Sequence, residues 1–152
     1  MTLPLLSIGQ SGHIKRWAMK KILIVDDDED DKDFLCEAIQ HIDRSAYCIW
    51  VSDGVHALRL INDPGFIPPD FIFLDLSMPK VGGIQCLDSI RKLSQYRNIP
   101  VIIYTTLPNA IDQLDISSFG PTSVLSKPTR IGDLIKAVEE IFSAQHRMAS
   151  DG

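Results

Sequence analysis

The sequence has few cysteines and no cysteine or histidine pattern that would suit a metal site or a disulfide framework. Cys36, Cys48 and Cys86 are odd in number, lie far apart and form no Cys-x-x-Cys pair. The four histidines are scattered and lack metal-ligand spacing. The sequence therefore predicts reduced, mostly buried thiols, and it indicates neither a zinc site nor a disulfide-rich fold.

Long hydrophobic runs and clusters of positive charge are also missing. No apolar run approaches the length of a membrane span, and the start of the chain makes a poor signal peptide because its basic residues follow the short apolar stretch. After residue 20 the chain carries 12 basic and 20 acidic residues, a net charge of −8. This balance argues against nucleic acid or an anionic membrane as a direct partner. We expect a cytoplasmic protein.

The length and composition fit one folded domain. The chain has 152 residues, of which 45% are hydrophobic and 23% charged, which is ordinary for a globular protein with a full core. The first 19 residues show no strong period and no obvious strand partner. We expect residues 1–19 to be a loosely ordered extension, residues 20–146 to form the domain and residues 147–152 to be a flexible tail. The alternative for the extension is a docking arm that uses its apolar residues.

From Lys21 onward, short apolar runs alternate with longer segments of helical period, which predicts βαβ units and a parallel sheet. Five strands are expected, at Ile22–Val25, Tyr47–Val51, Phe71–Leu74, Val101–Tyr104 and Ser123–Leu125. Five helices are expected between and after them, around Phe34–Ile42, Val55–Ile61, Gly83–Ser94, Ala110–Phe119 and Ile131–His146.

Acidic residues follow two of these strands directly. Asp26 and Asp27 come after Ile22–Val25, and Asp75 comes after Phe71–Leu74. Both strands are continuous apolar runs, typical of a parallel sheet covered on both faces, and such sheets place function at the carboxyl ends of their strands. Like charges gathered there need a cation, and an all-oxygen cluster suits a hard divalent ion such as Mg2+. The sequence predicts a metal-assisted acidic pocket.

Other acidic residues have a simpler explanation. Five of them crowd the first turns of the first helix, where the helix dipole favours negative charge: Asp28, Glu29, Asp30, Asp31 and Asp33. We interpret most of these as capping residues and solvated surface. Asp53 and Asp133 are likewise interpreted as an N-cap and a first-turn acid.

Two further strand ends add a hydroxyl and an ammonium. Thr105 and Thr106 follow the fourth strand, and Lys127 with Pro128 follows the fifth. Taken alone, Thr105 could be an ordinary helix cap and Lys127 an ordinary surface lysine. Asp75, followed by Met-Pro, is harder to explain as a simple turn.

Together these motifs resemble the receiver domains of two-component response regulators, from Lys21 to about Ala144. The signals are Val-Asp-Asp at 25–27, Leu-Asp-Leu-x-Met-Pro at 74–79 ending in Gly83, Thr105 after an apolar strand, and Lys127-Pro128. The resemblance implies a flavodoxin-like, doubly wound α/β fold with five parallel strands in the order 2-1-3-4-5 and five helices. Within this family, the chain is similar to the stand-alone regulators of chemotaxis.

The resemblance also implies roles for these residues. Asp75 would be the phosphoacceptor, and Mg2+, with Mn2+ as a possible substitute, would be held by Asp27, Asp75 and the backbone carbonyl of Ser77, with Asp26 binding through water. Lys127 would pair with a phosphoryl oxygen, and the bond from Lys127 to Pro128 would be cis. Thr105 would donate its hydroxyl to another oxygen and pull its loop inward.

Three residues depart from the pattern of the family. Val124 stands where many receivers carry the aromatic residue that turns inward during switching, so the output would rely more on loop and helix movement. Gly82 replaces a residue that is commonly acidic or an amide, and the apolar Leu107 lies near the mouth of the site. The lifetime of the phosphate is expected to depend on Ser77 and Leu107.

The resemblance favours a stand-alone response regulator in a phosphorelay, with a sensor histidine kinase or a histidine phosphotransfer protein as donor and an unknown downstream protein as partner. It would be no enzyme beyond its own aspartyl phosphorylation and dephosphorylation. A relay intermediate that passes phosphate onward and a phosphorylation-independent interaction module remain alternatives. An aspartate-nucleophile phosphohydrolase is disfavoured because Ser77 breaks its Asp-x-Asp signature. A nucleotide-binding protein is disfavoured because no glycine-rich phosphate loop follows any strand.

Overall fold

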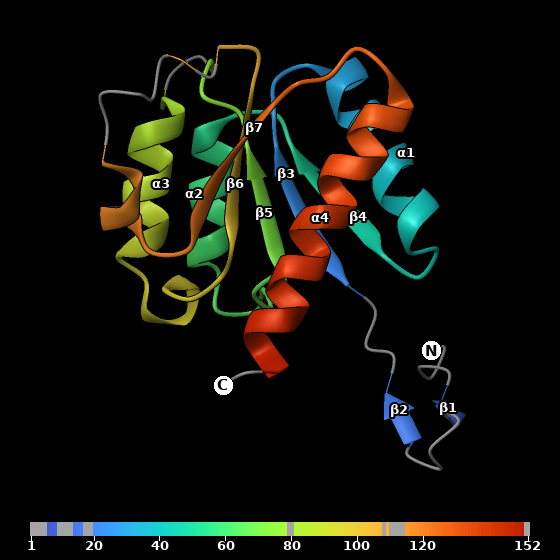
Figure 1. The fold of residues 1–152 in the computed structure, drawn as a ribbon. Helices are drawn as coiled ribbons and strands as arrows, with labels where there is room; N and C mark the ends of the chain where they lie inside the picture. Colours follow the sequence, from blue (N-terminus) through green and yellow to red (C-terminus); the bar gives the residue numbers. More distant parts are fainter. Residues whose placement is uncertain are drawn as a thin grey trace.

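A five-stranded parallel sheet forms the centre of the molecule (Figure 1). The computed structural model describes residues 6–8, 14–16, 20–78, 81–107, 109 and 115–150. The sheet has the order β4-β3-β5-β6-β7, and every neighbouring pair of strands is parallel. The strands are β3 (Lys21–Val25), β4 (Tyr47–Val51), β5 (Phe71–Leu74), β6 (Val101–Thr105) and β7 (Thr122–Ser126). The predicted doubly wound topology and strand order are confirmed.

Helices cover both faces of the sheet (Figure 1). The described residues form four α-helices, α1 (Glu29–Ile42), α2 (Gly54–Asn62), α3 (Gly83–Arg91) and α4 (Ile131–Ser150), and the two 3-10 helices η1 (Ser94–Tyr96) and η3 (Ile116–Phe119). Helices α1 and α4 pack on one face, and α2 and α3 pack on the other.

The α-helix expected at residues 110–119 differs from the structure. Residues 110–114 lie outside the described part of the chain, and residues 116–119 form η3, a 3-10 helix. Asp115 caps η3 by accepting from the main-chain N–H of Ser117, and Gly120 follows it with φ of 74°, a conformation that ends a helical turn. At the other end of the chain, α4 continues to Ser150, beyond the expected end near His146, so residues 147–150 are helical.

The segment before β3 contains two short strands that the sequence did not reveal. Strands β1 (Leu6–Ile8) and β2 (Ile14–Arg16) pair with each other in antiparallel orientation (Figure 1). Three residues per strand are too few to show the alternation from which a strand is recognised in a sequence. The other residues among the first 19 lie outside the described part, so the extension and the docking arm both stay predictions.

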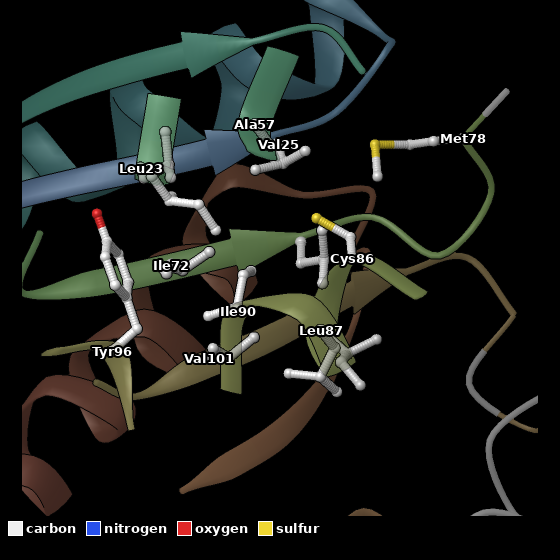
Figure 2. Close-up of a cluster of buried hydrophobic side chains, with 13 residues drawn as sticks. Leu23, Val25, Ala57, Ile72, Met78, Cys86, Leu87, Ile90, Tyr96 and Val101 are labelled. Carbon is white, nitrogen blue, oxygen red and sulfur yellow. The ribbon is translucent and has the colours of Figure 1, made fainter. Parts of the chain in front are cut away.

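The sheet separates two buried clusters because successive side chains of a strand point to opposite faces. Leu23 and Val25 of β3 point toward α2 and α3, in the cluster that Figure 2 shows together with Cys86 and Tyr96. The alternate residues of the same strand face α1 and α4, in a second cluster with Leu35 and Phe142. Within the residues that the structure describes, no helix is both long and apolar enough to cross a membrane.

Arg91, the last residue of α3, forms hydrogen bonds with the segments that precede β6 and β7. Its guanidinium donates to the main-chain oxygens of Tyr96, Ile99 and Pro121 at 2.8, 2.7 and 2.9 Å, and also to that of Phe119. These oxygens belong to the segments that lead into β6 and β7. One half-buried side chain therefore supplies donors to several main-chain oxygens of these connecting segments.

Candidate functional site

The carboxyl ends of β3 and β5 bring three aspartates together. Val25 pairs with Leu74 in the parallel register, so the residues that follow them, Asp26 and Asp75, leave the sheet at the same level. Carboxylate oxygens of Asp26, Asp27 and Asp75 lie within 4.8 Å of one another. Asp26 and Asp75 are buried, whereas Asp27 is exposed. The structure thus assembles the acidic pocket that the sequence predicts.

Main-chain groups orient the two buried carboxylates. One oxygen of Asp26 accepts from the N–H of Asp28 at 2.9 Å, and one oxygen of Asp75 accepts from the N–H of Ser77 at 3.3 Å. Burial raises the pKa of Asp26 above its ordinary value, although the hydrogen bond from Asp28 and the ammonium of Lys127 oppose this shift. Burial likewise raises the pKa of Asp75, with Lys127 opposing it. The pocket therefore favours a compensating cation.

Lys127 supplies such a charge. It follows β7, and its main-chain N–H donates to the carbonyl of Thr105 at 2.8 Å. Its ammonium lies 2.9 Å from an oxygen of Asp26 and 3.8 Å from an oxygen of Asp75, and its side chain is only 7% exposed. Burial lowers the pKa of Lys127, but hydrogen bonds with carboxylates outweigh burial and raise that pKa above its ordinary value. Lys127 is therefore a buried, charged partner of the cluster, and it is no surface lysine.

The expected cis bond between Lys127 and Pro128 is absent, since no peptide bond between described residues is cis. The prediction of a cis bond was therefore wrong. The lysine reaches Asp26 with a trans bond before proline, which is the lower-energy isomer.

Asp31 belongs to the site, although its place in the sequence predicts a solvated surface acid. It lies in the first turn of α1, and its carboxylate accepts from the Lys127 ammonium at 2.8 Å. The helix dipole alone explains an acid in this first turn, so the sequence gives no sign of the contact with Lys127, which is 96 residues away in the chain. The neighbouring Asp28 does cap α1 as expected, by accepting from the N–H of Asp31 at 3.1 Å. Asp53 caps α2 and Asp133 lies in the first turn of α4, as predicted.

Trp50 on β4 is a second residue of the site that no sequence motif marks. Its indole N–H donates to the main-chain oxygen of Asp26 at 2.7 Å, and the ammonium of Lys32 lies 4.7 Å from the centroid of one of its rings. The indole therefore supports the chain at the point where β3 delivers its acidic pair. No local motif marks it, because only the pairing of β4 with β3 places it there.

Thr105 ends β6 beside the lysine. Its side chain is fully buried, and its hydroxyl oxygen accepts from the N–H of Leu107 at 3.0 Å. The hydroxyl hydrogen remains free to turn toward an acceptor. Leu107 is 60% exposed and Ser77 is exposed as well, so both lie at the open side of the site. Val124 on β7 is 37% exposed.

The donor set suits a hard divalent cation. Three carboxylates within ligand distance of one another, two of them buried, offer the oxygen atoms that Mg2+ and Mn2+ prefer. Asp26, Asp27 and Asp75 are the residues that could hold such an ion, and the backbone carbonyl of Ser77 remains a predicted fourth ligand.

Comparison with known proteins connects this arrangement to a family. The family model of the response regulator receiver domain matches residues 22–139. The probable methanogenesis regulatory protein FilR2 of Methanothrix harundinacea is 33% identical over 123 residues, which cover 79% of each chain. The transcriptional regulatory protein CpxR of Escherichia coli is 31% identical over 128 residues, covering 84% of this chain and 51% of CpxR. The chain thus spans about half the length of this and other curated transcriptional regulators.

Solved structures have the same fold. The manganese-bound form of the response regulator Rcp1, a protein of Synechocystis, superposes with a TM-score of 0.69 at 29% identity, covering 82% of this chain and 92% of Rcp1. The ion in that structure is a property of Rcp1. It shows that a site in a protein similar to this chain accepts a divalent metal.

Proposed function

Because this chain belongs to the family of response regulator receiver domains, we propose that it accepts a phosphoryl group on Asp75 and signals through phosphorylation-dependent binding of another protein. The observation that carries the proposal is the buried Asp75 carboxylate, which shares a pocket with Asp26, Asp27 and the ammonium of Lys127. A structural ion pair would need one acid for one lysine. Here one lysine contacts three carboxylates, and the surplus of negative charge suits a cation and a phosphoryl group that arrive together.

The proposed reaction is a phosphoryl transfer from a phosphohistidine. An oxygen of Asp75 attacks phosphorus, the bond between phosphorus and the histidine nitrogen breaks, and its electron pair returns to the imidazole. The product is an acyl phosphate. Mg2+ or Mn2+, held by Asp27, Asp75 and the backbone carbonyl of Ser77 with Asp26 binding through water, would neutralise charge on the transferred group.

The chain's own residues would position the group. The Lys127 ammonium, 3.8 Å from Asp75, is close enough to follow the phosphoryl oxygens as they replace the carboxylate oxygen as its partner. The Thr105 hydroxyl would donate to another phosphoryl oxygen, and its hydrogen bond from the N–H of Leu107 would carry that movement into the loop after β6. Val124 has no ring to turn inward, so this loop is the proposed output element.

The partners follow from the same chemistry. A sensor histidine kinase or a histidine phosphotransfer protein would supply the phosphoryl group, and a downstream protein would read the altered loop. We propose that the protein acts in the cytoplasm, and that it catalyses only its own phosphorylation and dephosphorylation.

The test is intact mass after incubation with acetyl phosphate and Mg2+. Wild type should gain one phosphoryl adduct, which Asp75→Asn and EDTA should abolish. Asp88→Asn removes an exposed acid of α3 and should leave the adduct intact. An adduct that persists in Asp75→Asn would place the chemistry elsewhere. Lack of any adduct in wild type after rapid quenching would contradict the proposal and favour a phosphorylation-independent interaction module.

A further inference from the structure

Two cysteines that are 12 positions apart in the sequence lie side by side where α1 packs on the edge strand β4. Cys36 belongs to α1 and Cys48 to β4, and the two thiols are close enough that each shifts the pKa of the other. Both thiols are free and half-buried, and both pack against the same apolar cluster beneath α1 and α4.

A second contact between the same two elements supports this geometry independently. The ammonium of Lys32 lies 4.7 Å from the centroid of a Trp50 ring. Cys36 is one helical turn after Lys32, about 6 Å along α1. Cys48 is two residues before Trp50, on the same face of the strand and about 6.7 Å along it. A helix that connects two parallel strands runs opposite to them. The step from Lys32 to Cys36 along α1 and the step from Trp50 to Cys48 along β4 therefore go in the same direction in space. Because Lys32 contacts Trp50, Cys36 lies beside Cys48.

The third cysteine provides an internal contrast. Cys86 lies on α3, in the cluster on the opposite face of the sheet, and is fully buried. Burial raises its pKa to about 11, which keeps this thiol protonated and unreactive. Of the three thiols, two are therefore paired at an edge of the sheet, and one is isolated in the core.

Cys36 has the properties of the attacking thiol. The hydrogen bond from Cys48 lowers the pKa of Cys36, burial opposes this, and the nearby charge of Lys32 lowers the pKa further. The thiolate is the nucleophilic form of cysteine, so Cys36 would react first and Cys48 would resolve the product.

From this juxtaposition we propose that Cys36 and Cys48 form a redox modification site, at which a peroxide converts the two thiols into a reversible intramolecular disulfide. The Cys36 thiolate attacks a peroxide oxygen, the O–O bond breaks, and a sulfenic acid forms with loss of hydroxide. The Cys48 sulfur then gives up its proton and attacks the Cys36 sulfur, and the S–O bond breaks with release of water. In total, two thiols and one hydrogen peroxide give one disulfide and two waters. A dithiol reductant reverses the modification by thiol–disulfide exchange.

The location connects this modification to the acidic pocket. The same helix carries Asp31, which contacts Lys127, and the same strand carries Trp50, which donates to the main-chain oxygen of Asp26. A disulfide would fasten these two elements covalently, whereas their side chains now meet only through non-covalent contacts. Formation of this disulfide does not require phosphorylation of Asp75.

The experiment uses the full chain, reduced with dithiothreitol, desalted and then exposed to hydrogen peroxide. Alkylation with N-ethylmaleimide under denaturing conditions should count three reactive thiols before oxidation and one afterward, and the mass before alkylation should fall by about 2 Da because two hydrogens are lost. Tryptic digestion without reductant should join peptide 33–44 to peptide 45–59, while the peptide that contains Cys86 stays alkylated. Renewed dithiothreitol should restore three thiols.

The variants Cys36→Ser and Cys48→Ser should each lose the joined peptide. Because the decisive mapping is done on the wild type, the test remains valid even if a variant folds poorly. Three alkylatable thiols after peroxide, a bridge between two chains, a bridge to Cys86, or addition of oxygen to Cys36 without a bridge would each overturn the proposal.

Discussion

Replacing Lys127 with methionine tests how the pocket balances its charge. Methionine keeps much of the length of the side chain but removes the ammonium that lies 2.9 Å from Asp26 and 2.8 Å from Asp31. The side chains of Lys127 and Asp26 are 7% and 2% exposed, so their pair is buried, and breaking a buried pair by removing one partner costs about 3–5 kcal/mol. Asp31 is 37% exposed and can turn to water. We therefore expect a loss near the lower limit, about 3 kcal/mol of unfolding free energy.

The assay is urea unfolding at pH 7, once in EDTA and once in Mg2+. A ligand at 100 times its Kd stabilises a protein by about 2.7 kcal/mol. Mg2+ should raise the free energy of unfolding of the variant more than that of wild type, because in the variant the ion replaces the missing ammonium and does not compete with it. The stability gap between the two proteins should therefore narrow in Mg2+.

Lys92→Met provides the matched control. Lys92 pairs with Asp88 at 2.9 Å, but these side chains are 74% and 53% exposed, so little loss is expected and no dependence on Mg2+. Equal losses in the two variants, or a gap for Lys127→Met that Mg2+ leaves unchanged, would refute the reasoning.

Three further predictions concern the surroundings of the pocket. Gly83→Ala should lower the free energy of unfolding in urea by about 2 kcal/mol and weaken Mg2+ binding, because the added Cβ would lie 2.6 Å from the main-chain oxygen of Asp75. Gly132→Ala is the control, because no atom lies within 4 Å of its added Cβ, and it should not lower the free energy of unfolding. Arg91→Met should lower the free energy of unfolding by about 3 kcal/mol, because several main-chain oxygens lose a charged donor. The same replacement of exposed Arg59 should change little, and equal effects of the two variants would contradict the proposed role of Arg91. In EDTA at pH 7, Asp75→Asn should be more stable than wild type, because burial raises the pKa of Asp75 and disfavours its charged form in the folded state. The folded protein binds a proton at Asp75 more readily than the unfolded chain does, so wild type should gain stability as the pH falls through the raised pKa toward 3.8. The difference in stability between Asp75→Asn and wild type should therefore narrow over this range, and a difference that widens would contradict the predicted direction.

Much of the central fold could be predicted because its strands have a distinctive pattern. Strands that are buried on both faces must be apolar at every position, so Phe71–Leu74 could be recognised without an alignment, and its observed bounds agree with the prediction. A carboxylate that directly follows such a strand stands out, which is why Asp26 and Asp75 were found.

The parts that could not be predicted depend on contacts between distant elements. Asp31 looks like any first-turn acid, and only the packing of α1 beside the end of β7 turns it toward Lys127. The contact between Cys36 and Cys48 likewise needs the return of the chain from α1 into β4. The 3-10 helix at residues 116–119 has the apolar spacing of an α-helix but ends at the positive φ of Gly120, and composition alone does not reveal backbone conformation at that precision.

The position of Trp50 has a spectroscopic consequence. The sequence contains only two tryptophans, Trp17 and Trp50, so a Trp17→Phe chain would emit from one indole. That indole donates to the main-chain oxygen of Asp26 and lies beneath the Lys32 ammonium, and both contacts influence the energy and quenching of its excited state. The protein therefore carries its own fluorophore beside the acidic pocket, and we expect binding of a cation there to change this emission, which needs no attached dye.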